Sequence, residues 1–163
     1  MEKYVTYRDR ARQNIRVADH MLTMTYPMVK DPKLLVAVLE NLFMALTNAM
    51  AAVLHHERRG KRIGPFHDTF ESKFSHFKAY IVPGYNIDRK WVRFIAEIKE
   101  LVAEHKESPT EFPRKEKYVM ADERYKIRVL DEEKLKAALR KTKELVHELL
   151  QLVSRHETMH RRR

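Results

Sequence analysis

Apolar residues recur at helical spacing along most of the chain. In the first 29 residues they stand three and four apart, at Ala11, Ile15, Ala18, Leu22, Thr25 and Val29. This period predicts a helix from about Val5 to Val29, which Pro27 should end or kink. The next segment, Leu34 to Leu54, is apolar nearly all round, which is typical of the central helix of a bundle.

Capping signals predict where these helices begin and end. Asp31-Pro32 should start the central helix, since aspartate caps a helix and proline fits its first turn. Gly60 stands where a left-handed residue commonly ends a helix. Asp68, with Glu71 three residues later, resembles a capping box and predicts the start of a third helix.

Two further amphipathic helices complete the pattern. Pro83-Gly84 should stop the third helix, and Asp88 should cap the fourth. The predicted core face of the fourth helix is Trp91, Phe94, Ile95, Ile98, Leu101 and His105. Asp131 should cap a long last helix, whose apolar stripe is Leu135, Leu139, Thr142, Val146, Leu149 and Val153.

Residues 111–129 break the helical period. Tyr125, Ile127 and Val129 alternate with charged residues, and Tyr118 and Met120 could pair opposite them. Alternation of this kind predicts a short β-hairpin, or else an irregular insert, with its turn near 122–123.

Together these elements predict an all-α protein, an up-down bundle of about five helices with the hairpin or irregular insert before the last helix. Residues 1–163 form one domain, with the insert at 111–129 and a basic tail at 156–163. With 3 Gly and 6 Pro the composition favours long helices, and the absence of Cys excludes disulfides and thiolate zinc sites. The abundance of Lys, Arg and Glu suits a thermophile.

The central segment, Leu34 to Leu54, could be either a membrane span or a buried core helix. It is long enough to span a bilayer, yet it carries Glu40, Asn41, Thr47 and Asn48. A buried core helix is the better interpretation, so we expect no membrane partner. The chain begins with no apolar leader, and we expect a cytoplasmic protein.

Charge suggests the partner. Lys and Arg outnumber Asp and Glu by 33 to 23, a net charge of +10, which indicates a polyanion. The densest cluster is Arg58, Arg59, Lys61 and Arg62. These cations either clamp phosphates or complement the dipole of a helix C-terminus. The predicted nucleic-acid-binding set adds three arginines of the first helix, Arg8, Arg12 and Arg16; whether the groups share one face is left open. Tyr4, Tyr7, Tyr85 and Tyr118 are candidates for stacking on unpaired bases.

One motif could bind metal. His156 and His160 fit H-E-x-x-H, the spacing that places two imidazoles on one helix face for zinc. Only three residues follow, and a terminus gives such a site little support. We therefore predict no metal and no cofactor, with His156 and His160 as the weak exception.

The helix order resembles the HEPN group of helical bundles. The shared features are two long antiparallel helices, an alanine-rich second helix, a helix ending in His105, then an irregular segment and a last helix. Residues 18–62 are also similar in wording to an uncharacterised archaeal family of small helical proteins. HEPN proteins are typically dimeric, so the resemblance admits a homodimer. Many are metal-independent ribonucleases with an R-x4-6-H motif; the matching position here holds Lys99 and His105, with Lys in place of Arg.

Three functions remain. The favoured one is a non-enzymatic protein that binds RNA or a ribonucleoprotein through its basic clusters. The alternatives are a HEPN-type ribonuclease acting as a dimer, with Lys99 and His105 as its catalytic pair, and an oligomeric interaction or scaffold protein.

Overall fold

Five continuous helices make up most of the chain. The computed structural model describes residues 2–107, 110–114, 117–121 and 127–161, with side chains up to 105 and from 130 to 155. The five helices are, in order, α1–η1–α2 (Lys3–His20, Met21–Thr25, Tyr26–Val29), α3 (Lys33–Arg59), α4–η2–α5 (Phe70–His76, Phe77–Ile81, Val82–Gly84), α6 (Arg89–Glu107) and α7 (Glu132–Arg161). The predicted helical bundle is confirmed.

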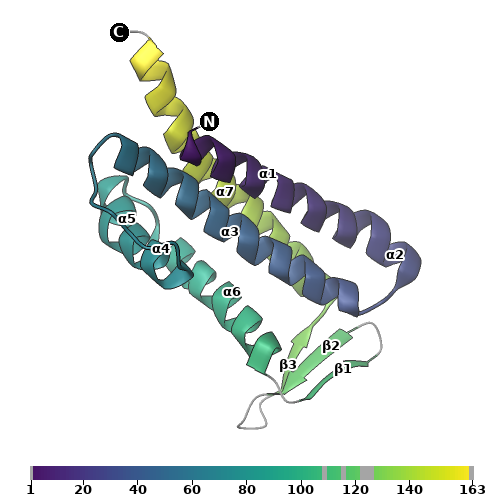
Figure 1. Ribbon diagram of the computed structural model, residues 1–163. Coiled ribbons are helices and arrows are strands. Elements are labelled where there is room, and N and C mark those ends of the chain that lie inside the picture. Colours follow the sequence, from purple (N-terminus) through teal and green to yellow (C-terminus); the bar gives the residue numbers. More distant parts are fainter. Residues whose placement is uncertain (1, 108–109, 115–116, 122–126, 162–163) are drawn as a thin grey trace.

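The central helix is α3, as its all-round apolar sequence predicts. It packs against α1, α6 and α7, and α1 and α3 lie side by side with opposite chain directions (Figure 1). Small side chains let α1 and α3 approach closely. Among those with no exposed surface are Ala11 and Ala18 on α1 and Ala45, Ala49 and Ala52 on α3. Between them Asn14 bonds to both Asn41 and Asn48, at 3.3 and 2.8 Å, and so fixes how the two helices align.

Two helices continue through a proline by widening into a π-helical turn. Pro27 follows η1 and Pro83 follows η2, each two residues after the last residue of the wide turn. In these turns the N–H groups of Tyr26 and Val82 donate to carbonyls five residues earlier. A proline ring clashes with the carbonyl four residues before it, and the wider turn relieves that clash. Pro27 therefore does not end the first helix.

The wide turn also changes which residues face the core. Tyr26 is fully buried, whereas Val29 is 60% exposed. The prediction that Val29 lies on the buried face is wrong because the π turn inserts a residue into the helical period. Ala11, Ala18 and Leu22, which precede or begin that turn, are fully buried as predicted.

Most predicted caps are confirmed. Asp31, Asp88 and Asp131 each accept a backbone N–H in the first turn of α3, α6 and α7, at 2.8 to 3.0 Å. The third helix differs, since Thr69 caps it by accepting the Ser72 N–H at 3.1 Å. The predicted capping role of Asp68 is wrong, because this carboxylate instead binds the ammonium of Lys73 at 2.6 Å.

The segment before α7 contains three short antiparallel strands in the order β1-β2-β3, namely β1 (Thr110–Arg114), β2 (Lys117–Ala121) and β3 (Ile127–Leu130). Residue 119 of β2 lies opposite residue 129 of β3. The turn of the predicted hairpin falls on residues 122–126, outside the described residues, so the hairpin as such stays a prediction.

Among the described helices, α3 is long and apolar enough to cross a membrane. However, 67% of its most apolar window is buried inside the protein, as in the core helix of a bundle.

Candidate nucleic-acid interface

The basic cluster lies at the C-terminal end of α3, where the helix closes in a Schellman turn. The Arg62 N–H donates to Glu57 O and the Lys61 N–H donates to Arg58 O, both at 3.0 Å. The left-handed residue is Lys61, with φ 56°, whereas Gly60 has φ −77°. The prediction for Gly60 is therefore wrong by one residue. Gly60 instead leaves room for the Arg62 guanidinium, which a Cβ at residue 60 would meet.

The Arg62 side chain belongs to a network around a buried carboxylate. Glu57 is 5% exposed, and one of its oxygens accepts the Arg62 Nε–H at 2.5 Å. Its other oxygen accepts the hydroxyl of Tyr85, from the turn before α6. Arg62 also donates to Nδ1 of His56 at 3.3 Å. Burial, together with the Glu57 carboxylate, raises the pKa of Tyr85 to about 12. These contacts fasten the loop after α3 to the helices beside it.

The remaining cations of the cluster surround a hollow of about 490 Å³, which we call the basic hollow. It is lined by Glu2, Lys3, Tyr4, His55, Arg58, Arg59, Lys61, Pro65 and Phe66. Arg59 lies over the Tyr4 ring, 5.7 Å from its centroid, and pairs with the exposed Glu2 at 3.5 Å. Four cations and one carboxylate therefore face this hollow.

Aromatic rings form one wall of the basic hollow. His55 is 4.9 Å from the Phe66 ring and stacks almost parallel on Tyr7 at 5.0 Å. Burial lowers the pKa of His55, and the nearby ammonium groups of Lys3 and Lys73 lower it further, against the opposing effect of Asp68. The lowered pKa favours the uncharged imidazole, which presents a flat ring to the hollow.

Two cations also lie close to the Tyr7 ring. Arg10 and the buried Lys73 lie 5.4 and 5.3 Å from its centroid. Of the candidate stacking residues Tyr4 and Tyr7, Tyr4 lines the hollow but is itself buried. Tyr7 is not part of the lining and stacks behind His55. Tyr85 is instead bound to Glu57, and the Tyr118 side chain lies outside the described residues.

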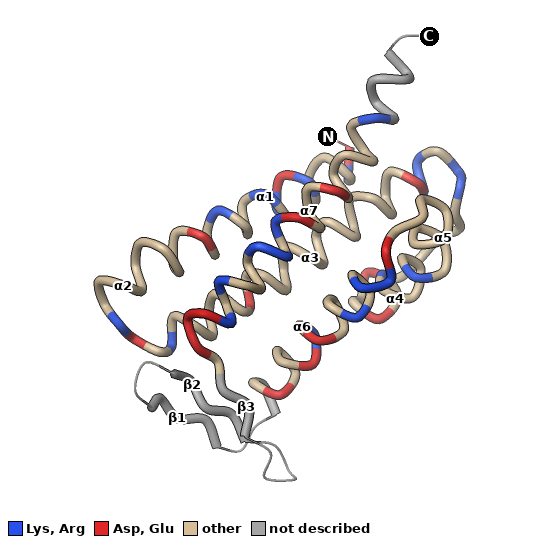
Figure 2. The backbone as a smooth tube through the Cα atoms, turned by 180° about the vertical axis from the view of Figure 1, so that it is seen from behind, with Lys and Arg blue, Asp and Glu red and all other residues tan. Residues whose placement is uncertain are grey.

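The arginines of α1 belong to a different surface. Arg12 and Arg16 line a groove of about 340 Å³ between α1 and α7, which we call the α1–α7 groove. At 100° per residue they lie about 180–220° around α1 from Lys3, whereas Tyr7 lies within about 40° of it. Figure 2 shows the cations of the loop after α3 and those along α1 as separate groups. The predicted set is therefore not one contiguous face.

The α1–α7 groove also contains partners for its charges. Lys143 pairs with Asp19 at 2.8 Å, and Arg16 donates to the Gln13 side chain at 2.7 Å. Arg8 is only 21% exposed in its side chain and pairs with its neighbour Asp9.

The candidate ribonuclease pair is held apart on α6. The Lys99 ammonium lies over the rings of Phe43 and Phe70, at 5.6 and 5.4 Å. The His105 Nε2 faces Glu40 Oε1 at 3.4 Å. Six residues of helix separate their directions by about 120°. Lys99 and His105 therefore contact different neighbours and do not converge on one point.

Metal ligands are not gathered in the described part of the chain: no group of three or more His, Asp or Glu side chains there could hold an ion. The helix α7 continues to Arg161, so the backbone of the predicted tail is largely helical. The side chains of His156 and His160 lie outside the described residues.

No protein-family model, no curated protein and no solved structure matches the chain.

Part of the basic hollow could not be predicted from the sequence patterns. No sequence pattern indicates Lys3, from the first turn of α1, or Phe66, from the loop after α3, yet both line it. The antiparallel pairing of the first two long helices carries the relevant signal, because it brings the start of one beside the end of the other.

Proposed function

We propose that the protein is a non-enzymatic RNA-binding helical bundle and that the basic hollow holds single-stranded RNA. The supporting observation is the combination in one hollow of exposed cations with aromatic walls. Cations bind phosphates without regard to sequence, and flat rings stack on unpaired bases. Lys3, Arg58, Arg59 and Lys61 would hold phosphates, while His55 and Phe66 would meet a base.

This proposal leaves Arg62 out of the interface. Its guanidinium neutralises the buried Glu57, and removing it would leave a buried carboxylate with less compensation. The arginines of the α1–α7 groove, Arg12 and Arg16, are also left out, because they lie on another side of α1 from the basic hollow.

The test compares two triple variants that remove the same charge. One replaces Arg58, Arg59 and Lys61 of the basic hollow by Gln; the other replaces the exposed Arg12, Arg16 and Arg140 by Gln. Fluorescence anisotropy measures the affinity for a single-stranded RNA of about 12 nucleotides as the KCl concentration rises. Circular dichroism checks that both variants are folded.

We expect the hollow variant to bind weakly and to have a log–log salt slope shallower by about 2, since each phosphate contact contributes about 0.7 for single strands. The matched variant should retain most of the affinity and the slope. Equal losses in the two variants would mean that net charge alone attracts RNA. Binding by the unaltered protein that is insensitive to salt would also contradict the proposal.

A HEPN-type ribonuclease, with the fold and dimer that this resemblance implies, is the alternative to be tested beside it. Metal-free cleavage needs an acid or base and a cation aimed at the same phosphate. Lys99 and His105 point to different neighbours, so we expect no cleavage above background in a chelator. Chelator-resistant cleavage that His105→Ala abolishes in a folded protein would replace our proposal by this one.

An interaction role has its own supporting observation. Three exposed apolar residues gather where the first helix ends: Met24, Met28 and Val29 are 58%, 85% and 60% exposed. Clustered exposed apolar side chains are typical of contact surfaces. If this end mediates self-association, Met28→Glu should lower the molar mass measured by light scattering at high protein concentration; an unchanged monomer in both proteins would argue against it.

A further inference from the structure

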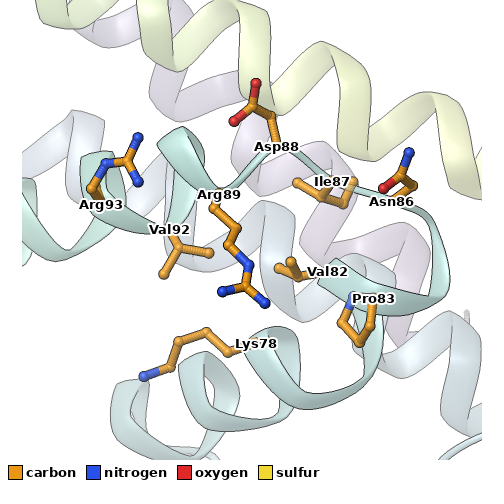
Figure 3. A pocket seen from close by; sticks show the side chains of 9 residues that line it. All are labelled: Lys78, Val82, Pro83, Asn86, Ile87, Asp88, Arg89, Val92 and Arg93. Carbon is orange, nitrogen blue, oxygen red and sulfur yellow. The ribbon is translucent and has the colours of Figure 1, made fainter.

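A second hollow lies between α4–η2–α5 and the start of α6, on residues that the RNA proposal does not use. Its volume is about 840 Å³, within the range of about 300–1,000 Å³ for small-molecule sites. The residues that line it are Lys78, Val82, Pro83, Asn86, Ile87, Asp88, Arg89, Val92 and Arg93 (Figure 3). We call it the α5–α6 hollow.

Its charges are unbalanced. Three cations and one carboxylate line the hollow, an excess of two positive charges. The carboxylate, Asp88, is engaged in capping α6, where its Oδ1 accepts the Lys90 N–H at 2.9 Å. Within the described part of the chain, neither Arg89 nor Arg93 has an ion-pair partner, and the Lys78 ammonium rests over the Phe74 ring at 4.5 Å.

The cations do not all point the same way. The guanidinium of Arg89 extends into the opening between Val82 and Val92, and the side chain of Lys78 borders the same opening from η2, whereas Arg93 turns aside (Figure 3). Arg89 and Lys78 can therefore approach one ligand from two helices, and Arg93 adds to the positive field around it.

The floor between these cations is apolar. Val82 and Ile87 are 9% and 5% exposed, and the side chains of Pro83 and Val92 continue the same surface. A ligand seated here would meet hydrocarbon over one side and positive charge over the other.

We propose that the α5–α6 hollow binds a small organic phosphate monoester with an apolar body. Arg89 and Lys78 hold the phosphate, and the apolar body lies on Val82, Pro83 and Val92. The planar guanidinium of Arg89 can donate two parallel hydrogen bonds to phosphate oxygens.

Charge favours a phosphate monoester over a carboxylate. A phosphate monoester carries about −1.5 to −2 at neutral pH, which balances the excess of two positive charges. A carboxylate would leave one cation uncompensated. The apolar floor in turn favours an ester over inorganic phosphate, because burying hydrocarbon adds free energy of binding that the bare ion cannot supply.

The test uses phenyl phosphate, benzoate and inorganic phosphate, each titrated into the full chain. Isothermal calorimetry gives the affinities, and amide chemical shifts in ¹H–¹⁵N spectra report whether residues of the α5–α6 hollow respond. We expect phenyl phosphate to bind about tenfold more tightly than either of the other two. Arg89→Gln should weaken it about tenfold or more, while the exposed Arg140 on α7 serves as matched control, with Arg140→Gln changing the affinity less than about twofold.

A second variant tests the floor. Val92→Thr keeps the side-chain shape but replaces one methyl group by a hydroxyl. It should therefore reduce the preference for phenyl phosphate over inorganic phosphate while leaving the affinity for inorganic phosphate unchanged. The proposal is overturned if phenyl phosphate causes no saturable shifts, if Arg89→Gln and Arg140→Gln have equal effects, or if inorganic phosphate binds as tightly as phenyl phosphate. None of these outcomes bears on the RNA proposal, which uses other residues and another probe.

Discussion

Two sets of charged residues share the end of α3 and have opposite surroundings. Arg58, Arg59 and Lys61 point outward around the basic hollow, whereas Glu57 and Arg62 meet across the turn, with Glu57 only 5% exposed. The partners of the first set lie at the surface: Arg59 pairs with the exposed Glu2, and Arg58 donates to the carbonyl of Ile63 at 3.4 Å. The second set is fixed by hydrogen bonds to His56 and Tyr85. Neighbours in sequence thus divide into cations available to a ligand and charges that hold the loop.

The physical reason for this division is the cost of burying charge. A buried carboxylate needs partners, because isolation from water penalises it by several kcal/mol. Arg62 supplies the opposite charge and Tyr85 a hydrogen bond. Arg58 and Lys61 are exposed to water, so neither needs an opposite charge within the protein, and each can exchange water for a phosphate oxygen at small cost.

Both sets depend on the core under α3, which gives the largest expected effect. Leu46 is fully buried near the middle of α3. Leu46→Ala should lower the free energy of unfolding by about 2–5 kcal/mol, measured by urea denaturation. RNA affinity measured well below the melting temperature should stay unchanged, because no residue of the basic hollow is altered. A loss below about 1 kcal/mol would show that α3 is not packed as described.

A smaller effect should separate the two sets directly. Glu57→Gln should lower the free energy of unfolding by about 1–3 kcal/mol, because it removes the buried negative charge to which Arg62 and Tyr85 are hydrogen-bonded. The matched control is Glu2→Gln at an exposed carboxylate that pairs with Arg59; it should change the unfolding free energy by less than about 0.5 kcal/mol.

The arginines provide the complementary comparison. Arg62→Gln should lower the free energy of unfolding and leave RNA affinity unchanged. Arg58→Gln should instead lower RNA affinity and leave the free energy of unfolding unchanged. If the two arginine variants behave alike in both urea denaturation and RNA binding, the division between the sets is wrong.

The sequence predicted the helices better than the division of charges. Apolar spacing and the caps Asp31, Asp88 and Asp131 depend on residues that are close in sequence, so a short stretch of sequence is enough to predict them. Val29 was misassigned because the π turn before Pro27 shifts the helical phase, and nothing in the local period marks such a turn. Thr69 replaced Asp68 as a cap because Lys73 offered Asp68 an ion pair.

The candidate site depended on contacts between distant segments. The cluster of cations was visible in the sequence, but the role of Arg62 required knowing that Glu57 is buried and that Tyr85 reaches it. In the same way, the α1 arginines could be assigned to another surface only after α1 and α7 were seen to form a groove. Charge runs identify where cations are, and packing decides which of them face a ligand.

The smallest expected effect concerns the Tyr85 hydroxyl. Tyr85→Phe removes one hydrogen bond to Glu57, while Arg62 still binds the same carboxylate, so the cost at neutral pH should be about 0.5–1.5 kcal/mol.

The pH dependence of stability tests the same hydroxyl more specifically than its cost at neutral pH. Folding raises the pKa of Tyr85 to about 12, above the ordinary value near 10, so the protonated hydroxyl is favoured in the folded state. The stabilisation is therefore complete below about pH 10 and is lost as the pH rises toward 12. Urea denaturation between pH 9 and 12 should show a steeper fall in stability for the unaltered protein than for Tyr85→Phe. Tyr80→Phe, at an exposed tyrosine, is the control and should follow the unaltered protein. Parallel curves for the unaltered protein and Tyr85→Phe would mean that the hydroxyl does not stabilise the buried carboxylate. Arg62 would then be the partner that stabilises Glu57 without help from Tyr85.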